Sequence, residues 1–342
     1  MTGPPAPDWA AAARHLAAAG HRLDCATPPV RLAGGLANRN YRVRLDGRPA
    51  VFRCPPPGPL AAGASDMARE ARVLEALHPA FPLAPRLLHA CLDPEVIGVP
   101  FLLIAWRRGV AIGATVPAPH DREAADWMPR ALVSTMAAIH RLDPEALGLG
   151  GLGRPAGFAA RQLAGWQARA AAAFGADRPP ALDALLARLA ASVPPDAPAC
   201  LLHMDLKFDN LLLDLAARRV RAVIDWDMGT RGPPAFDLAV LLSYWIGPDD
   251  PPAVKALRAT PALAPGWPGR AAVAALYAAA AGGLPPDLGW HLALARLRLA
   301  TAWMQLYRLW QRGALAGPRY GGFAALAAAV LAHALDRFGD VA

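Results

Sequence analysis

The spacing of hydrophobic positions divides this chain into a strand-rich first third and a largely helical remainder. Between residues 30 and 53, the short runs VRLAG, NYRVRL and AVFR predict three antiparallel strands, because side chains alternate between the two faces of a strand. Asp46-Gly47, between the last two runs, is a typical hairpin turn. The runs PRLLHACLD (85–93) and VPFLLIAWRRG (99–109) predict two further strands, and the second is apolar enough to be central.

Helical spacing accompanies these strands at two places. Segment 8–20 has Asp8 in the N-cap position and Gly20 in the C-cap position. Segment 67–79 places apolar residues on one face and ends at a proline. The first part of the chain therefore predicts the order β-β-β-α-β-β.

Helical patterns dominate from residue 121 onward. They cover 122–142, 158–174, 181–193 and 290–315. Short apolar runs that end in polar loops lie between them, and no internal repeat is present. We expect an α+β protein with a small β-rich lobe over residues 1–107 and a larger helical lobe over residues 108–342.

Composition narrows the class of protein. Hydrophobic residues make up 55% of the 342 residues and charged residues 18%, which indicates a globular chain. The formal net charge is +8, with 35 basic and 27 acidic residues. Its arginines are scattered along helices and form no stripe interleaved with aromatic residues, so no nucleic-acid partner is expected. The charge suits a small anionic ligand or has no specific partner.

Other segments also bear on class and location. The apolar stretch 324–335 is too short to span a bilayer, so no membrane partner is expected. The N-terminal residues have no basic region followed by an apolar one, which favours a cytoplasmic protein. The four cysteines form no CxxC pair and predict free thiols. The sequence does not indicate an oligomeric state.

Two acidic segments, LLHMDLKFDN (201–210) and VIDWDMGT (223–230), each follow a hydrophobic run. Phosphoryl transfer from ATP needs a carboxylate to accept a hydroxyl proton, oxygen ligands for Mg²⁺ and a cation on the phosphates. Asp205 is a candidate base, and Asn210 and Asp225 offer oxygens to a metal. Lys207, one of only two lysines in the chain, lies where it could reach the transferred phosphoryl group. The two segments therefore predict the halves of one charged site.

The first segment resembles the protein-kinase pattern H-R-D-L-x-x-x-N, and the second stands in the place of D-F-G with the sequence I-D-W-D. With the following GPPAFDLAVLLSYW, the chain resembles the aminoglycoside phosphotransferase and choline-kinase-like family of small-molecule kinases. Within that family it looks most like the phosphotransferase domains associated with acyl-CoA dehydrogenases. GGLANRNYRV, REARVLEAL, LDPEALGLGGLGRP and WHLALARLRLA extend the similarity over nearly the whole chain.

This resemblance implies a bilobal protein-kinase-like fold and a role for individual residues. It implies Asp205 as catalytic base, Asn210 and Asp225 as metal ligands, and Asp227 as a further ligand or a carboxylate behind them. Asp237 would brace the catalytic loop, and His203 would hydrogen-bond within it. In the β-rich lobe the implied nucleotide-binding residues are Gly34, Gly35, Asn38, Arg53, Glu70, Ala105 and Trp106.

The phosphate-binding cation departs from the family pattern. A kinase usually places a lysine on the third strand, but no lysine precedes Lys207, and Arg53 is the only basic residue at the matching position. An arginine fork is bulkier than an ammonium group and is not equivalent to it. Arg53 serves as the phosphate ligand, or the protein binds nucleotide and transfers poorly. Glu70 is the expected partner of this cation, with Glu75 as its rival.

We therefore expect an ATP- and Mg²⁺-dependent phosphotransferase that acts on a hydroxyl of a small molecule. Because aminoglycosides are polycations and this chain is basic, a neutral or anionic acceptor such as a hydroxy acid or hydroxyacyl-CoA is the better expectation. The resemblance implies that helices of the larger lobe line the acceptor pocket, so one or two Arg or Trp residues of segment 290–307, among Trp290, Arg296, Arg298 and Trp303, would face that acceptor. The alternatives are a nucleotide-binding pseudokinase or scaffold and a metal-dependent phosphohydrolase.

Overall fold

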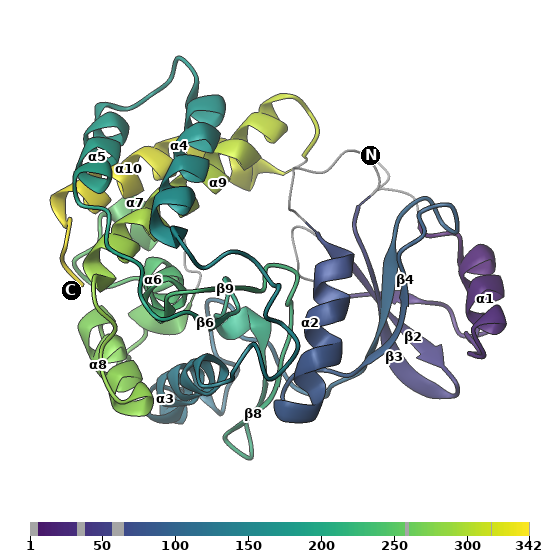
Figure 1. Cartoon of the computed structure of the whole chain (residues 1–342). Helices are drawn as coiled ribbons and strands as arrows, with labels where there is room; N and C mark the ends of the chain where they lie inside the picture. The colour runs from purple at the N-terminus through teal and green to yellow at the C-terminus, as the bar shows by residue number, and fades with distance from the viewer. Residues whose placement is uncertain (1–5, 33–37, 57–64, 257–259, 316, 342) are drawn as a thin grey trace.

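The computed structural model describes residues 6–32, 38–56, 65–256, 260–315 and 317–341, which form a β-rich lobe and a helical lobe (Figure 1). The β-rich lobe contains a five-stranded antiparallel sheet in the order β1-β2-β3-β5-β4. Its strands are β1 (Val30–Arg31), β2 (Arg39–Leu45), β3 (Arg48–Cys54), β4 (Leu87–Cys91) and β5 (Phe101–Ala105). The five predicted strands are confirmed, and the apolar β5 lies inside the sheet as expected.

The Asp46-Gly47 hairpin sets the register of β2 against β3. Both residues have positive φ, 51° and 73°, as a two-residue hairpin turn of this type requires. Leu45 pairs with Arg48, and the pairing runs without a break to Arg39 and Cys54. This regular register fixes which β3 side chains point to which face of the sheet.

The two faces of the sheet have different helices and different chemistry. Helix α1 (Trp9–Ala18) covers one face, where Trp9 lies 5.0 Å from the Phe52 ring. Helix α2 (Met67–Ala80) covers the other face, on the side of the helical lobe (Figure 1). Because Phe52 points toward α1, the next residue, Arg53, points toward α2 and the helical lobe.

The first helix begins as predicted and ends slightly early. The Asp8 carboxylate accepts a hydrogen bond from the N–H of Ala11 at 2.9 Å, which confirms Asp8 as the N-cap. The helix ends at Ala18, and Gly20 follows the C-cap residue with a φ of +83°. A glycine is favoured there because residues with a side chain rarely adopt positive φ.

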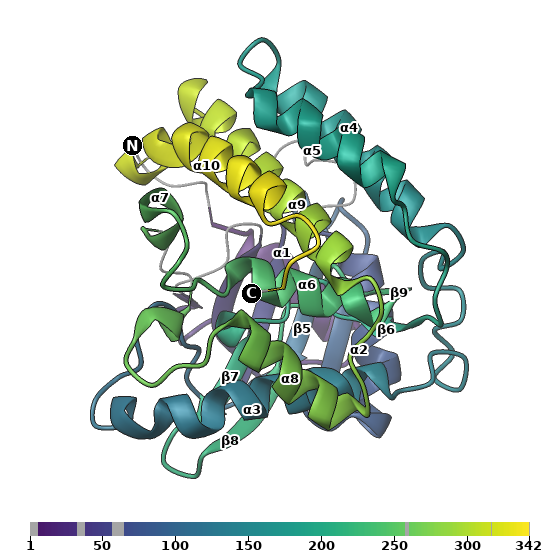
Figure 2. The ribbon, with the colours of Figure 1, turned by 90° about the vertical axis from the view of Figure 1, so that its left-hand side faces the viewer.

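The helical lobe contains all the helices predicted after residue 121 and others besides. Its α-helices are α3 (Asp121–His140), α4 (Phe158–Phe174), α5 (Pro180–Ala191), α6 (Pro234–Tyr244), α7 (Pro252–Lys255), α8 (Arg270–Ala281), α9 (Leu288–Gln311) and α10 (Phe323–Asp336). Short 3₁₀ turns cover Phe208–Asn210, Pro261–Leu263 and Pro318–Gly322. Helix α9 packs against α4, α6 and α10, and Figure 2 shows α9 and α10 side by side.

Two short strand pairs in the helical lobe bring the acidic segments together. Strand β6 (Cys200–Leu202) pairs with β9 (Thr230–Gly232), and β7 (Leu211–Asp214) pairs with β8 (Arg219–Val223). The loop 203–210 connects β6 to β7, and the loop 224–229 connects β8 to β9. Since the strands at both ends of these loops are paired, the two loops lie next to each other.

One hydrophobic core joins the helical lobe to the inner face of the β-rich lobe. It includes α2 residues such as Leu74 and Leu77, β5 residues Leu102 and Ile104, and the fully buried Trp226. The predicted division after residue 107 falls between β5 and α3, and it stays a prediction. Among the described helices, none has the length and apolar character to cross a bilayer.

Candidate active site

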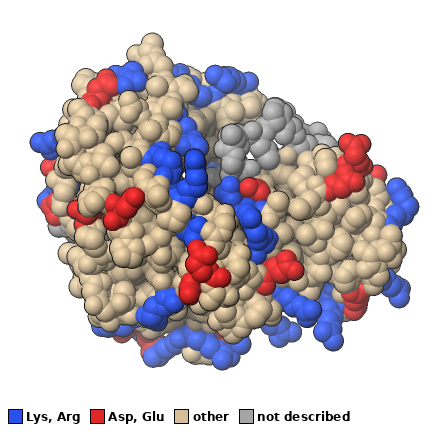
Figure 3. All heavy atoms as spheres, in the orientation of Figure 1, with Lys and Arg blue, Asp and Glu red and all other residues tan. Residues whose placement is uncertain are grey.

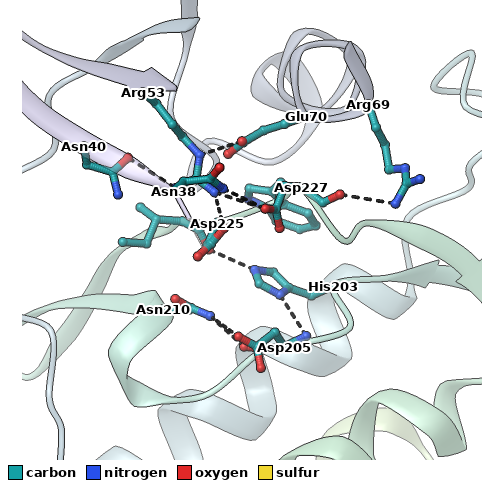
Figure 4. A network of polar contacts seen from close by, with 12 residues as sticks. Asn38, Asn40, Arg53, Arg69, Glu70, His203, Asp205, Asn210, Asp225 and Asp227 are labelled. Atoms are coloured by element: carbon teal, nitrogen blue, oxygen red, sulfur yellow. Dashed lines mark hydrogen bonds and ion pairs between the residues drawn. The ribbon is translucent and has the colours of Figure 1, made fainter. Parts of the chain in front are cut away.

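The loop after β6 is built around His203, whose side chain is fully buried. Its Nε2 lies 2.9 Å from the carbonyl oxygen of Ile224 in the second acidic segment. Its Nδ1 accepts a hydrogen bond from the N–H of Asp205 at 3.3 Å. The imidazole thus links the two loops and orients Asp205 without reaching the cleft itself (Figure 4).

Asp237, in the first turn of α6, holds the backbone of the same loop. Its carboxylate accepts hydrogen bonds from the N–H groups of His203 at 2.8 Å and Met204 at 2.6 Å. Met204 has a φ of 72°, so this turn needs support that a flexible loop would not provide. Burial acts to raise the pKa of Asp237, but the hydrogen bonds it accepts outweigh burial and lower it.

His140, the last residue of α3, is part of this support. Its Nε2 lies 3.2 Å from Asp237 Oδ2, and its Nδ1 lies 2.7 Å from the hydroxyl of Tyr277. The imidazole therefore orients Asp237 from behind, through α3 and α8. Nothing in the local sequence of α3 signals this contact, because it arises only when three helices pack.

Asp205 is half-buried and shares this loop with the half-buried Lys207 and the buried Asn210. The Asn210 amide donates to the Asp205 carbonyl at 2.8 Å and to its Oδ2 at 3.0 Å. Lys207 contacts Asp205 Oδ2 and lies 3.2 Å from the Asp209 carboxylate. Burial acts to lower the pKa of Lys207, but the carboxylates of Asp205 and Asp209 raise it, so the group is charged. Both polar hydrogens of Asn210 face Asp205, which leaves its carbonyl oxygen for another partner.

The second acidic segment faces the β-rich lobe. Asp225 has a φ of 70°, and its Oδ1 contacts the guanidinium of Arg53 on β3. Asp227 lies 3.5 Å from the same guanidinium and accepts a hydrogen bond from the Asn38 amide at 2.8 Å (Figure 4). Arg69 on α2 donates to the Asp227 carbonyl at 3.3 Å. Residues from both lobes therefore meet at these two aspartates.

Arg53 pairs with Glu70, as the resemblance implied, and not with Glu75. Its Nε donates to Glu70 Oε2 at 2.7 Å, and its Nη1 lies 3.3 Å from the Oδ1 of Asn40. Glu70 is 1% exposed, whereas Glu75 points to solvent. One guanidinium thus contacts the α2 glutamate and both loop aspartates. A lysine ammonium lacks the planar fork that makes these simultaneous contacts possible.

Burial and mutual repulsion shape the charges of this cluster. Burial raises the pKa of Glu70, and the guanidinium of Arg53 opposes that rise. Burial and the neighbouring Asp225 charge raise the pKa of Asp227. Burial acts to raise the pKa of Asp225, but Arg53, His203 and Lys207 together lower it. Three carboxylates around one arginine carry a negative excess that a further cation would neutralise.

The residues present fit a Mg²⁺ ion. The Asn210 carbonyl oxygen and the Asp225 carboxylate are hard oxygen donors, and Mg²⁺ takes one or two such ligands beside phosphate oxygens and water. Asn38 Oδ1 is buried and has no hydrogen-bond partner among the described residues, so the site also has an unused acceptor. No cluster of three or more His, Cys, Asp or Glu side chains in the described ranges has the geometry to enclose a metal alone. A metal here would depend on ligands from the substrate.

The remaining predicted nucleotide-binding residues belong to the β-rich lobe and to the segment that leaves it. Gly34 and Gly35 lie outside the described residues. Ala105 ends β5, and its N–H donates to the Arg86 carbonyl at 2.8 Å, so that donor is already used. Trp106 is half-buried, and the Arg42 guanidinium lies 5.8 Å from the centre of its ring. Both residues lie at the point where the chain leaves the sheet for the helical lobe.

Comparisons with known proteins agree with this architecture. The model of the phosphotransferase enzyme family matches residues 30–276. Acyl-CoA dehydrogenase family member 11 of Gallus gallus is 34% identical over 221 residues, which is 63% of this chain and 28% of that protein. The chain thus spans less than a third of the length of this relative.

Solved structures share the fold at lower identity. A protein from Ralstonia eutropha JMP134 assigned as an aminoglycoside phosphotransferase has a TM-score of 0.78 at 22% identity, covering 97% of this chain and 98% of its own. A thermostable mutant of aminoglycoside phosphotransferase APH(4)-Ia, in a ternary complex with AMP-PNP and hygromycin B, has a TM-score of 0.57 at 18% identity, covering 91% and 94%. These likenesses confirm the kinase-like fold that the sequence predicted.

Proposed function

The chain belongs to the phosphotransferase enzyme family, and from that premise we propose that it is an ATP- and Mg²⁺-dependent kinase of a small-molecule hydroxyl. One observation carries the proposal: Arg53 and Glu70 of one lobe meet Asp225 of the other, within the same network as Asp205 and Asn210 (Figure 4). Phosphoryl transfer depends mostly on positioning and charge neutralisation, which this arrangement provides.

Each group has a role that follows from its position. Asp205 would accept the proton of the acceptor hydroxyl as its oxygen bonds to the γ-phosphorus and the bond to the leaving ADP breaks. Lys207, charged and adjacent, would neutralise the transferred group. Asn210 and Asp225 would hold Mg²⁺, which supplies positive charge to the phosphate oxygens when bound. Arg53, oriented by Glu70, would bind the phosphates from the side of the β-rich lobe.

The nucleotide would lie between the lobes. Its base would contact the backbone near Ala105 and Trp106, where the chain leaves β5 for the helical lobe. Asn38, beside Asp227, would contribute its unpartnered oxygen on the phosphate side. ATP is supported as the donor because AMP-PNP, an analogue of ATP, is bound by a neighbour of the same fold.

An anionic or neutral acceptor fits better than a polycation. The net charge is +8, and the site's lysine faces the acceptor side beside Asp205. A hydroxy acid or a hydroxyacyl-CoA is therefore the acceptor class we propose, and the similarity to a protein named for acyl-CoA dehydrogenase activity supports it. Phosphorylation of such a hydroxyl would give a phosphate ester, which is a better leaving group than hydroxide.

The rival function is a nucleotide-binding pseudokinase, and a specific observation favours it. Arg53 contacts Asp225 directly and so occupies a carboxylate that Mg²⁺ would need. A kinase must then open this contact when nucleotide and metal bind, whereas a pseudokinase would keep it.

Transfer from ATP distinguishes the two. The protein is incubated with ATP, Mg²⁺ and a panel of hydroxylated metabolites, and products are sought by the mass increase of one HPO₃. A kinase gives a phosphorylated product that depends on Mg²⁺. Tight ATP binding with no product for any acceptor would favour the pseudokinase, and release of phosphate from phosphomonoesters without ATP would favour a phosphohydrolase.

A further inference from the structure

Arg298 on α9 has a surrounding unlike that of the other half-buried basic residues near the site. One Nη of its guanidinium lies 3.6 Å from the Met228 sulfur, and its Cζ lies 6.0 Å from the centre of the Trp166 ring. Throughout the described part of the chain, no carboxylate lies within ion-pair distance of it. By contrast, the half-buried Arg231 pairs with Glu145 at 2.6 Å, and the half-buried Arg69 pairs with Asp66 at 3.1 Å.

The position of Arg298 connects it to the acceptor side of the site. Met228 directly follows Asp227 in the second acidic segment. Tyr244, the last residue of α6, has the Lys207 ammonium 5.3 Å from its ring centre. Burial and the charge of Asp205 raise the pKa of Tyr244, and the positive charges of Lys207 and Arg298 oppose that rise. Tyr244 therefore lies against the catalytic loop through Lys207.

A second basic residue lies beside the ring of Trp166 on α4. The Cζ of Arg169 lies 4.8 Å from the centre of its ring, and Arg169 is exposed and has no carboxylate partner in the described ranges. Figure 3 shows Lys and Arg side chains gathered around the hollow between the two lobes. Two guanidinium groups therefore lie beside the aromatic surface of Trp166, and positive charge beside an aromatic surface suits an amphipathic anion.

Arg296, the other arginine named from this helix, points elsewhere. Two residues along an α-helix correspond to about 200°, so Arg296 and Arg298 face opposite sides of α9. Arg296 is 3% exposed, and its Nη2 is buried without a hydrogen-bond partner among the described residues. Of the two candidates, only Arg298 contacts a residue of the catalytic loops.

Resting on the kinase function proposed above, we propose that Arg298 binds an anionic group of the phosphoryl acceptor, a carboxylate or a phosphate. The acceptor hydroxyl would then lie at Asp205, and its carbon chain would pack against Met228 and Trp166. An arginine fork suits either anion because it donates two parallel hydrogen bonds. Arg298 would thus be a specificity-determining residue.

The test compares Arg298→Gln with wild type on matched acceptors. Hydroxybutyrate, hydroxyhexanoate and hydroxydecanoate are tested beside the corresponding diols, amino alcohols and coenzyme A thioesters, with ATP and Mg²⁺. We expect the variant to raise KM for the anionic acceptors about tenfold to a hundredfold, the range for losing a hydrogen bond to a charged group, and to change the diols little. Arg312→Gln, an exposed arginine near the end of the same helix, is the matched control.

Two sources of the anion are separated by the thioester arm. If Arg298 binds a carboxylate, the variant loses the free acids and not the thioesters. If it binds a phosphate of the carrier, the reverse holds. Equal effects on acids, thioesters and diols, or a wild-type preference for amino alcohols, would overturn the proposal.

Binding without turnover keeps the inference separate from the kinase function. Calorimetry with hydroxydecanoate and its thioester, in the presence of AMP-PNP and Mg²⁺, requires no chemistry. Binding that Arg298→Gln abolishes, together with no phosphorylated product, would uphold the anion site and refute the kinase. Phosphorylation that is the same in wild type and Arg298→Gln would uphold the kinase function and refute the anion site. If the wild-type protein neither binds nor phosphorylates these acceptors, both proposals are refuted.

Discussion

Replacing Arg53 by methionine removes the cation that both lobes share while keeping an unbranched side chain of similar length. The wild-type guanidinium is 6% exposed and makes contacts with Glu70, Asn40 and Asp225, with Asp227 3.5 Å away. The variant leaves three carboxylates close together without their common partner. We expect losses in both stability and nucleotide affinity.

The stability loss follows from the burial of the pair. Removing one partner of a buried ion pair costs about 3–5 kcal/mol, because the remaining charge stays buried without compensation. Part of that cost is relieved here, since Asp227 keeps its hydrogen bond from Asn38 and Asp225 is half-buried. A decrease of about 3 kcal/mol in the free energy of unfolding is therefore expected, measured by urea denaturation.

The affinity loss follows from the chemistry of the phosphates. A charge-assisted hydrogen bond contributes about 1.5–3 kcal/mol, which corresponds to a roughly tenfold to 150-fold increase in the Kd of ATP. Titration with a fluorescent nucleotide, below the unfolding transition, measures this. Arg48→Met serves as the control, because Arg48 lies on the same strand and is exposed. Arg53→Lys keeps the charge and should lose less.

An unchanged Kd in a folded Arg53→Met protein would refute the reasoning, because the phosphates would then be held by another group. A Kd that falls instead of rising would show that the contact between Arg53 and Asp225 competes with nucleotide and metal. That outcome would favour the pseudokinase interpretation.

Three further predictions test other parts of the structure. Asp205→Asn should lower turnover by about 10²- to 10⁴-fold with ATP affinity unchanged, measured by single-turnover kinetics, because it removes proton acceptance and no phosphate contact; unchanged turnover would disprove its role as base. Asp237→Asn should leave one buried N–H of the catalytic loop without an acceptor and destabilise the protein by about 1–3 kcal/mol, and an unchanged denaturation midpoint would contradict this. His291, buried on α9, has a pKa that burial lowers from 6.5 to about 4, so it stays neutral in the native state while the unfolded chain takes up a proton. Native stability should therefore fall by about 3 kcal/mol as pH drops from about 6.5 to about 4, and His291→Phe should remove that slope in pH-dependent denaturation.

The strands of the β-rich lobe and most helices could be predicted from local patterns of residues. Helix α8 and the pairing of β6 with β9 could not. Alternation in NYRVRL and AVFR, with Asp46-Gly47 between them, is enough to predict β2, β3 and their hairpin. Helix α8 was not predicted, because RAAVAALYAAAA is two thirds alanine and has little contrast between two faces. Strands β6 and β9 are three residues each and pair across 27 intervening residues, from Leu202 to Thr230, so only the fold brings them together.

The site divides in a similar way between what spacing fixes and what packing adds. Asp205, Asn210 and Asp225 could be named from the sequence, because one loop and one short hairpin set their positions. His140 and Tyr244 could not, since they approach the site from helices whose packing no local pattern describes.

Asn40 is an intermediate case, because its position opposite Arg53 could have been predicted from the hairpin. In a two-residue hairpin at 46 and 47, partner numbers add to 93, so Leu45 faces Arg48 and Asn40 must face Arg53. The contact between the Asn40 amide oxygen and Arg53 could therefore be predicted by counting residues from the turn. The contact between Arg53 and Asp225 could not be predicted in this way, because it joins two lobes at positions 172 apart in sequence number. Hairpin register thus aims the arginine at the cleft, and only the docking of the lobes decides which acidic groups it meets there.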